Sequence, residues 1–472
     1  MMKKLFTLCS LLLAIASFGQ VQLNMPVISN WDNDQLPSYN NISFNEIWGY
    51  AAEGGGEYAI MGSLRGTYIF DITGNQATNP APIGYFTGRD TAANGVNRDY
   101  KTYGNYLYGV CDQGNASLQI FDLSGLPAGV VKVSDNQNIV KTCHTIFIDH
   151  DRIYFSGSRD SSGTPHALVV ASLADPRNPQ VISVLDPPAF DYVHAAYVRN
   201  DTAYLSCGNL GMFVYDYSDP ANPQLIQSFT NYDQQGYNHS AWVSEDGQYL
   251  VFTDETHGTG VKLYDISDLS NPILKSIFRS NLLGTVDSLG DAGSIAHNPF
   301  IVGRKAFISY YHDGVQVFDF SDPRHPVRCA YFDTDPLNDN YAGYGGAWGV
   351  YPFLPSHHIL GSDLLNGLYV LDGNDPAVLG AESQTKGRAH SMLVYPNPSS
   401  EDFYFSANLN HPADLAIQVF DIEGELVLTQ QHALPNGTST LKISCSNLAN
   451  GVYFVRTQAA NFNFSDKIVL IR

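Results

Sequence analysis

Short apolar runs that alternate with polar positions recur along the first 372 residues, and most are closed by Gly, Asp, Asn or Pro. In Ser294–Pro326, for example, the runs Phe300–Val302, Ala306–Tyr310 and Val315–Phe320 follow one another with turn residues between them. Period-2 runs of this length, bounded by turn formers, predict antiparallel strands joined by hairpins. A unit this small cannot bury its apolar faces alone, so it predicts neighbours of the same kind.

The clearest repeated mark is an apolar strand that ends in Asp, or once in Ser, before a turn. Its seven copies end at Asp71, Asp122, Ser172, Asp216, Asp265, Asp319 and Asp372. The spacings between them are 51, 50, 44, 49, 54 and 53 residues. A second mark, a His or Trp that opens an earlier strand, precedes the first in most copies: Trp48, His144, His194, His239, His297 and Trp348. A period of about 50 residues is typical of the four-stranded blades of propellers, so residues 20–372 predict a seven-bladed β-propeller.

The composition changes after Asp372. Residues 373–390 contain no aromatic residue and predict a linker. Residues 391–472 contain strand-like segments separated by Pro-Asn-Pro, Glu-Gly and Asn-Gly turns. This pattern predicts a small immunoglobulin-like β-sandwich, so the whole chain is expected to be all-β.

The N-terminus predicts a secretory signal peptide over residues 1–19. Lys3-Lys4 precede the apolar stretch Leu5–Phe18, and small residues lie just before a cut ahead of Gln20. No later stretch is apolar for about 18 residues, so no transmembrane helix is expected in the mature chain. Residues 21–45 are expected either to add a strand to the last blade or to cover a sheet edge.

The charge balance excludes one class of partner. The chain has 46 acidic and 25 basic residues, which gives a net charge of −21. A surface this acidic repels phosphate backbones, so nucleic acid is not expected to bind.

The C-terminal segments VYPNPSSEDFYF, VFDIEGELV, LANGVYFVRT and KIVLIR span the predicted sandwich in order. They resemble the type A sorting domain of the Bacteroidetes type IX secretion system. The resemblance implies that residues 391–472 engage the type IX machinery, and that the protein is carried across the outer membrane and then released or held at the cell surface.

Residues from about 40 to 372 resemble a second family, choice-of-anchor B, which carries LVIVP-type propeller repeats. The motifs that carry this resemblance are EIWGY, RDYKTY, CHTIFI, NHSAWVSEDGQYLVFTDE, AHNPFIVG and GAWGVYPFLPS. The resemblance implies an exported propeller and assigns no activity to it. Its partner is then an unknown surface, glycan or protein ligand.

The predicted blades bring several titratable residues to one end of the central channel. The start of the first strand and the end of the antiparallel second strand lie on the same face of each blade. We therefore expect a group there that contains His144, His194, His239, His297, Asp112, Asp254, Glu255, His312, Asp313 and Asp363. Imidazoles beside carboxylates suit a divalent cation, with His239, His297, Asp254 and Glu255 as candidate ligands. The alternative is that each histidine is a structural residue that makes hydrogen bonds within or between blades.

The cysteines allow one specific pairing. The five outside the signal peptide are an odd number without a Cys-x-x-Cys pair, which argues against a disulfide framework and against a structural zinc site. Cys111 and Cys143 are expected at the same end of neighbouring blades, either as a disulfide or as two buried thiols. The oxygen-rich loop Asp333–Asn340 lacks the Gly and Glu of a calcium loop, so we expect it to be an ordinary solvated loop.

No catalytic motif stands out. The chain contains no G-x-S-x-G, H-E-x-x-H or Walker sequence. The first hypothesis is therefore a binding module that presents one channel face to a ligand. The alternative is a hydrolase or lyase with a histidine and carboxylate site, with or without a metal ion, at the same place.

Overall fold

The computed structural model describes residues 22–91, 95–280, 293–336, 343–379, 392–395, 399, 402–409, 413–421, 425–435, 437–459 and 462–470. The predicted signal peptide, most of the predicted linker and the second half of the Asp333–Asn340 loop lie outside these ranges. The contacts within the chain separate one compact unit, residues 1–300 and 306–372, from a second, which comprises residues 373–472 and the short segment Ile301–Lys305.

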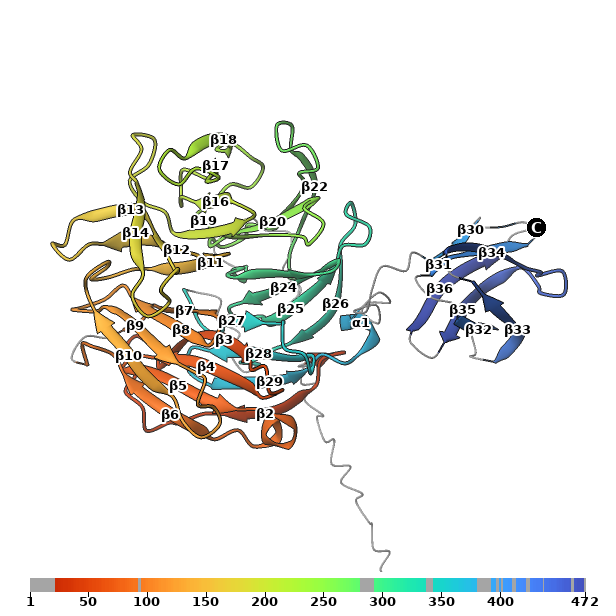
Figure 1. Ribbon diagram of the computed structural model, residues 1–472, viewed down its shortest axis with the longest axis horizontal. Coiled ribbons are helices and arrows are strands. Elements are labelled where there is room, and N and C mark those ends of the chain that lie inside the picture. The colour runs from red at the N-terminus through yellow and green to blue at the C-terminus, as the bar shows by residue number, and fades with distance from the viewer. Residues whose placement is uncertain are drawn as a thin grey trace, which may run out of the picture. The chain divides into compact units, whose positions relative to one another are not determined.

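The first unit is a β-propeller of seven antiparallel sheets (Figure 1), which confirms the predicted fold. Blades one and two contain β3 (Phe44–Ala51), β4 (Glu57–Ser63), β5 (Gly66–Asp71) and β6 (Pro82–Thr87), then β7 (Arg98–Tyr103), β8 (Tyr106–Cys111), β9 (Leu118–Asp122) and β10 (Val131–Asn136). Blades three and four contain β11 (Thr145–Asp149), β12 (Arg152–Arg159), β13 (Pro165–Ser172) and β14 (Gln180–Leu185), then β15 (Ala195–Arg199), β16 (Thr202–Ser206), β17 (Met212–Asp216) and β18 (Gln224–Phe229).

The remaining blades follow the same plan. Blade five contains β19 (Asn238–Val243), β20 (Tyr249–Asp254), β21 (Val261–Asp265) and β22 (Ile273–Phe278). Blade six contains β23 (Pro299–Val302), β24 (Lys305–Tyr310), β25 (Gly314–Asp319) and β26 (Val327–Phe332), and blade seven contains β27 (Ala347–Tyr351), β28 (His358–Asp363) and β29 (Gly367–Asp372). In every blade the third strand ends at the Asp or Ser that marks the sequence repeat.

The N-terminal segment completes the ring. Strand β2 (Val27–Trp31) pairs with β29 and so supplies the outer strand of blade seven. Strand β1 (Gln22–Leu23) pairs with β26 and adds a fifth strand to blade six. The first of the two expectations for residues 21–45 is therefore correct, because β2 adds a strand to the last blade and covers the outer edge of β29.

Aromatic side chains fill the central axis of the propeller. The first strands of neighbouring blades contact each other around the axis. Ring centroids lie 5.1 Å apart for Phe147 and Tyr197, 4.7 Å for Tyr197 and Trp242, 4.8 Å for Trp242 and Phe300, and 5.6 Å for Phe300 and Phe353. Each of the first four residues comes three positions after a histidine in the sequence. Three residues of a strand span about 10 Å, so these aromatic residues lie about 10 Å farther along the channel than the histidines. We call these five residues the aromatic plug.

The C-terminal unit is a β-sandwich. Its sheets have the orders β30-β31-β34 and β33-β32-β35-β36. Their strands are β30 (Met392–Tyr395), β31 (Phe403–Leu409), β32 (Ala413–Phe420), β33 (Leu426–Leu434), β34 (Gly437–Ile443), β35 (Gly451–Ala459) and β36 (Phe462–Leu470). Side chains from both sheets, such as Phe405 and Ile417, share one buried core. The closer likeness to an immunoglobulin domain stays a prediction.

Helical structure is limited to the 3-10 turn η1 (Gly74–Thr78) and α1 (Pro376–Leu379) within the described ranges. Neither of these helices is long and apolar enough to cross a membrane.

Candidate functional site

Four histidines from consecutive blades form a continuous arc at one end of the channel. His144 and His194 directly precede β11 and β15, His297 precedes β23 by two positions, and His239 lies in β19. Neighbouring ring centroids are 4.2, 4.2 and 4.3 Å apart along the series. We call these residues the histidine arc, and this end of the channel the mouth. The repeat places them together because each occupies the same position in its blade.

A β-bulge directs one member of the arc toward the axis. The pairing of β19 with β20 shifts between Asn238 and Ser240, so His239 is the extra residue. The same shift between Ala347 and Gly349 directs Trp348 in blade seven, and the Trp348 ring lies 4.7 Å from that of His297. Bulges often re-aim a side chain beside a functional site in this way.

The Nδ1 atoms of the arc all face fixed partners. His194 Nδ1 lies 3.2 Å from the His239 carbonyl, and His297 Nδ1 lies 2.5 Å from the Trp348 carbonyl. His239 Nδ1 lies 3.0 Å from the Ser240 hydroxyl, which lies 3.0 Å from the His297 carbonyl and so donates to it. A carbonyl oxygen can only accept a hydrogen bond, so Nδ1 of His194 and of His297 carries the proton. The Ser240 hydroxyl donates its own proton to a carbonyl, so His239 Nδ1 also carries a proton, and all three assignments follow from these partners. The Nε2 atoms of these rings therefore present lone pairs.

Glu255, which directly follows β20, is the carboxylate that meets the arc. Its oxygens lie 3.9 Å from His239 Nε2 and 3.8 Å from His297 Nε2. Tyr311 donates a hydrogen bond of 2.6 Å to it. Burial raises the pKa of Glu255, and burial lowers the pKa of His194 and His239 well below its usual range. The imidazoles are therefore neutral at pH 7 and free to act as ligands or acceptors.

His144 ends the arc with an unusual contact. Its Nδ1 lies 2.7 Å from Asp112 Oδ2, and its Nε2 lies 2.8 Å from His194 Nε2. Two nitrogen lone pairs repel at this distance, so a proton or another cation belongs between them. His144 and Glu255 are the parts of the group nearest to solvent, with side chains 14% and 15% exposed.

Tyrosines surround the arc, and no clear motif in the sequence predicted them. Ring centroids lie 6.2 Å apart for Tyr192 and His194, 5.4 Å for Tyr237 and His194, and 5.2 Å for Tyr344 and Tyr311. We call Tyr192, Tyr237, Tyr311 and Tyr344 the tyrosine rim. The only available signal was Tyr-x-His, which occurs at Tyr192 and again at Tyr237.

Two glycines make room for the rim. Gly157 and Gly208 adopt φ of +54° and +58°, a region that favours glycine. A Cβ atom on Gly157 would lie 2.6 Å from the Tyr192 ring, and one on Gly208 would lie 2.6 Å from the Tyr237 ring. Both tyrosine rings thus pack against glycines whose backbone conformation other residues rarely adopt.

Asp254 was expected among the metal ligands, and the structure shows it facing elsewhere. It forms a fully buried ion pair with Lys262 and accepts a 2.7 Å hydrogen bond from Tyr232. Successive side chains of a strand point to opposite sides, so Asp254 enters the blade when Glu255 turns toward the axis.

Asp363 and the pair His312-Asp313 also lie apart from the arc. Asp363 accepts hydrogen bonds from the backbone of Leu365 and Asn366 and from Thr334, so it orders a hairpin turn. His312 is buried, which lowers its pKa to about 4, and its charged neighbours are His257 and Asp335. The carboxylates of the expected mouth group thus divide into Glu255 and Asp112, which contact the histidine arc, and Asp254 and Asp363, which are structural.

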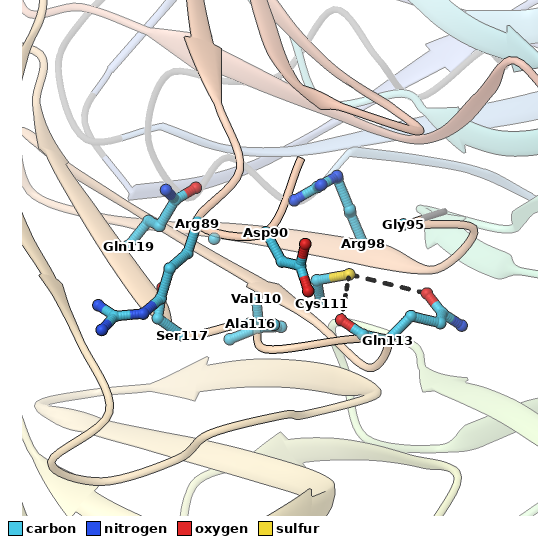
Figure 2. Close-up of a pocket in the computed structure, with 11 residues that line it drawn as sticks. Arg89, Asp90, Gly95, Arg98, Val110, Cys111, Gln113, Ala116, Ser117 and Gln119 are labelled. Carbon is cyan, nitrogen blue, oxygen red and sulfur yellow. Dashed lines mark hydrogen bonds between the residues drawn. The ribbon is translucent and has the colours of Figure 1, made fainter. Parts of the chain in front are cut away.

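The disulfide expected between Cys111 and Cys143 is not present, because both are free, buried thiols. Their backbones do meet, since the Cys143 N–H donates to the Cys111 carbonyl at 3.1 Å. The sulfurs turn apart: Cys143 faces the carbonyls of Thr145 and Ser156, and Cys111 faces Gln113, as Figure 2 shows. The alternative of two buried thiols is the correct one.

Figure 2 shows a small pocket beside Cys111, with Arg89, Asp90 and Arg98 in its lining. Arg98 is 6% exposed and donates to the Ser63 carbonyl, so it links blades one and two. Arg89 pairs with Asp135. These arginines are structural, and the pocket lies on blade two rather than within the arc.

A surface group of Asp149, His150 and Asp201 also has donor atoms within 4.8 Å of one another. Asp201 already pairs with Arg152 at 2.7 Å, and the His150 side chain is 62% exposed. These residues are accounted for by two neighbouring hairpin turns, β11–β12 and β15–β16.

Glu46 lies in blade one, buried, and accepts hydrogen bonds from Trp348 Nε1 at 3.2 Å and Asn298 Nδ2 at 3.4 Å. Burial, with the nearby Asp99 charge, raises its pKa from 4.5 to about 8, against the opposing effect of Lys101. Folded protein therefore holds this proton at pH 7, whereas the unfolded chain releases it.

This pKa shift predicts a pH-dependent gain of stability in Glu46→Gln. The folded pKa is raised, so the parent protein loses stability as pH rises from about 4.5 to about 8. The variant cannot ionise, and its free energy of unfolding should exceed that of the parent by about 4 kcal/mol at pH 8 and by little at pH 4, since one pKa unit corresponds to about 1.4 kcal/mol. Urea unfolding at both pH values measures this, and a difference that does not grow with pH would contradict it.

The C-terminal unit matches a known family. Residues 393–471 match the model of the secretion system C-terminal sorting domain. The protein is therefore exported by type IX secretion to the cell surface or the extracellular space.

The other comparisons are distant. No curated protein matches the chain. Two similar solved structures are the periplasmic gluconolactonase PpgL of Pseudomonas aeruginosa, with 11% identity and a TM-score of 0.49, and the computationally designed protein Ika8, with 9% and 0.42. The match to PpgL covers 85% of this chain, the match to Ika8 covers 73% of it, and each match covers 99% of the other protein's chain. Similarities this weak carry no information about a ligand or an activity.

Proposed function

We propose that this exported propeller, of the choice-of-anchor B type, is a binding module that takes a neutral, hydroxyl-rich ligand such as a cell-surface glycan at its mouth. The observation that carries the proposal is the tyrosine rim around Glu255. Tyr192 and Tyr344 are 37% and 56% exposed, although Tyr192 packs against the buried His194 and Tyr344 packs against the buried Tyr311.

The chemistry of the mouth selects the kind of ligand. Ligand sites combine aromatic walls with a few placed polar groups, and tyrosines offer both a flat apolar face and a hydroxyl. Among the described residues, no lysine or arginine makes a hydrogen bond or ion pair with the arc, Glu255 or the rim. The net charge of −21 also repels anions. A neutral ring that bears hydroxyl groups fits these conditions better than a phosphate or a polyanion.

Tyr192→Ala and Tyr344→Ala test this proposal. Each is expected to weaken binding of a neutral oligosaccharide, identified on a glycan array, by about tenfold, or ~1.4 kcal/mol. Tyr192→Phe keeps the ring and should retain most of the affinity. The matched control is Tyr85→Ala, which removes a tyrosine that is 41% exposed on β6, an outer strand of blade one.

Titration of each variant by calorimetry measures these effects, with choline as the cationic probe. Tyrosine cages also bind quaternary ammonium ions. Binding of choline without any neutral glycan, or equal losses in Tyr85→Ala and Tyr192→Ala, would refute the proposal.

One observation favours a second function, a hydrolase or lyase at the same mouth. Glu255 has a pKa raised by burial and a short hydrogen bond from Tyr311, which suits a carboxyl group that exchanges a proton with a substrate. Turnover of neutral glycosides or lactones that is lost in Glu255→Gln would establish this activity.

A further inference from the structure

We infer that the histidine arc holds a divalent transition-metal ion, such as Zn²⁺, on the Nε2 atoms of His194 and His239 and a carboxylate oxygen of Glu255. This inference rests on the proposed function and deepens it, because it adds a metal ion to the proposed ligand site. The three donor atoms already lie within 4.8 Å of one another.

The orientation of the imidazoles is that of metal ligands. Metal-bound histidines almost always donate their second ring N–H to a carbonyl, a carboxylate or another fixed partner, which sets the tautomer and the ring direction. His194 does so to the His239 carbonyl, and His239 does so to the Ser240 hydroxyl. A structural role in the blade interface would be fulfilled by these Nδ1 contacts alone. It would not require the Nε2 atoms to converge beside Glu255.

The distances require only small movements on binding. Donor atoms in a tetrahedral zinc site with bonds of about 2.0 Å lie about 3.3 Å apart. Glu255 Oε2 lies 3.9 Å from His239 Nε2, so a side-chain adjustment of under about 1 Å brings both into range. Glu255 sits just after the last residue of β20, where such an adjustment costs no strand pairing.

The contact between His144 and His194 shows what holds the arc together when no metal ion is bound. Their Nε2 atoms lie 2.8 Å apart while both Nδ1 atoms face acceptors, so one proton lies between the two Nε2 atoms. A metal ion on His194 Nε2 would displace this proton and leave His144, held by Asp112, beside the ion. His297, whose Nε2 lies 3.8 Å from Glu255 Oε1, flanks the ion on its other side.

The donor set selects the class of metal. Imidazole nitrogen with a single carboxylate suits Zn²⁺, Cu²⁺, Ni²⁺ or Co²⁺, whereas Ca²⁺ and Mg²⁺ take oxygen ligands. Three protein ligands leave at least one coordination position open, as in sites that bind or activate a ligand. That open position would face the tyrosine rim.

Metal analysis and calorimetry on the purified full-length protein test the inference. We expect about one zinc or other transition-metal ion per chain, removal by chelator, and rebinding of Zn²⁺. His194→Ala and Glu255→Gln should each weaken Zn²⁺ binding by more than about a hundredfold, which is the upper end of what loss of a mere outer-shell partner costs. The matched control is His325→Ala, which removes an exposed histidine that also pairs with a carboxylate, Asp322, at 3.0 Å.

Cobalt substitution adds a readout that depends on the site itself. Co²⁺ in the parent protein should give the visible absorption of a low-coordinate site, and Glu255→Gln should change it even if His194→Ala fails to fold. Absence of stoichiometric metal, or equal loss of Zn²⁺ in His325→Ala, would overturn the inference. If the chelated protein still bound glycan in a way that depends on Tyr192, the proposed function would stand and the metal ion would be refuted as part of the ligand site. If the protein bound Zn²⁺ but no glycan, the metal site would stand and the proposed function would be refuted.

Discussion

Replacing residues 27–31 with a Gly-Ser segment of equal length is expected to open the propeller ring and destabilise the first unit by more than about 3 kcal/mol. Strand β2 supplies the outer strand of blade seven, with Asn30 opposite Tyr369 and Trp31 opposite Leu368. Trp31 also packs against Phe70 of blade one, with ring centroids 4.8 Å apart. The segment thus joins the last blade to the first.

The contribution of the tryptophan can be measured separately. Trp31→Ala removes contacts with Phe44, Tyr68 and Phe70 and is expected to cost about 3 kcal/mol, the lower end of the range for a large aromatic residue. Chemical unfolding of the full-length chain, followed by fluorescence and by proteolysis, gives the value.

The same N-terminal segment offers a matched control. A Gly-Ser replacement of Gln22–Leu23 removes β1, which adds a fifth strand to a blade that already has four. It should cost less than about 1 kcal/mol, as surface changes usually do. If both replacements had the same effect, ring closure would not be the reason for the loss.

The propeller was predictable because its signal is repeated. Each third strand ends at an Asp or Ser that closes a hairpin, and seven copies at one period leave few other architectures. The arc was predictable for the same reason. His144 and His239 occupy one position of the repeat, and that position determines which end of the channel they reach.

What the sequence did not predict depends on partners from other strands. Asp254 and Glu255 are adjacent, and their directions depend on Lys262 of β21, whose buried ammonium pairs with Asp254. Three tyrosines of the rim, Tyr192, Tyr237 and Tyr344, come from segments before inner strands, and Tyr311 directly follows β24, so strand periodicity does not predict them. Tyr192 also depends on the backbone of Gly157 in another strand. The directions of the Cys111 and Cys143 sulfurs are equally local, and strand order does not determine them.

The adjacent carboxylates Asp254 and Glu255 have different roles, and their substitution gives the second large expected effect. Asp254→Asn should destabilise the protein by about 3–5 kcal/mol, because it leaves the fully buried ammonium of Lys262 without its counter-charge. The remaining partner of Lys262 Nζ is the Gln234 carbonyl at 2.7 Å, which does not neutralise the charge. Glu255→Gln should change stability little, because the amide oxygen can still accept the Tyr311 hydrogen bond, yet it should abolish Zn²⁺ binding.

The double variant Asp254→Asn Lys262→Met distinguishes loss of a counter-charge from general damage to β20. Without the ammonium, the neutral side chain at position 254 no longer faces a buried charge, so much of the lost stability should return. Unfolding in urea gives the stabilities, and calorimetry gives the Zn²⁺ affinity of each folded variant. If Asp254→Asn lost Zn²⁺ while keeping its stability, Asp254 would be a ligand after all, and the division between the two carboxylates would be wrong. The structure favours the division because the Lys262 and Tyr232 contacts of Asp254 engage both of its oxygens, and neither remains to bind a metal ion at the mouth.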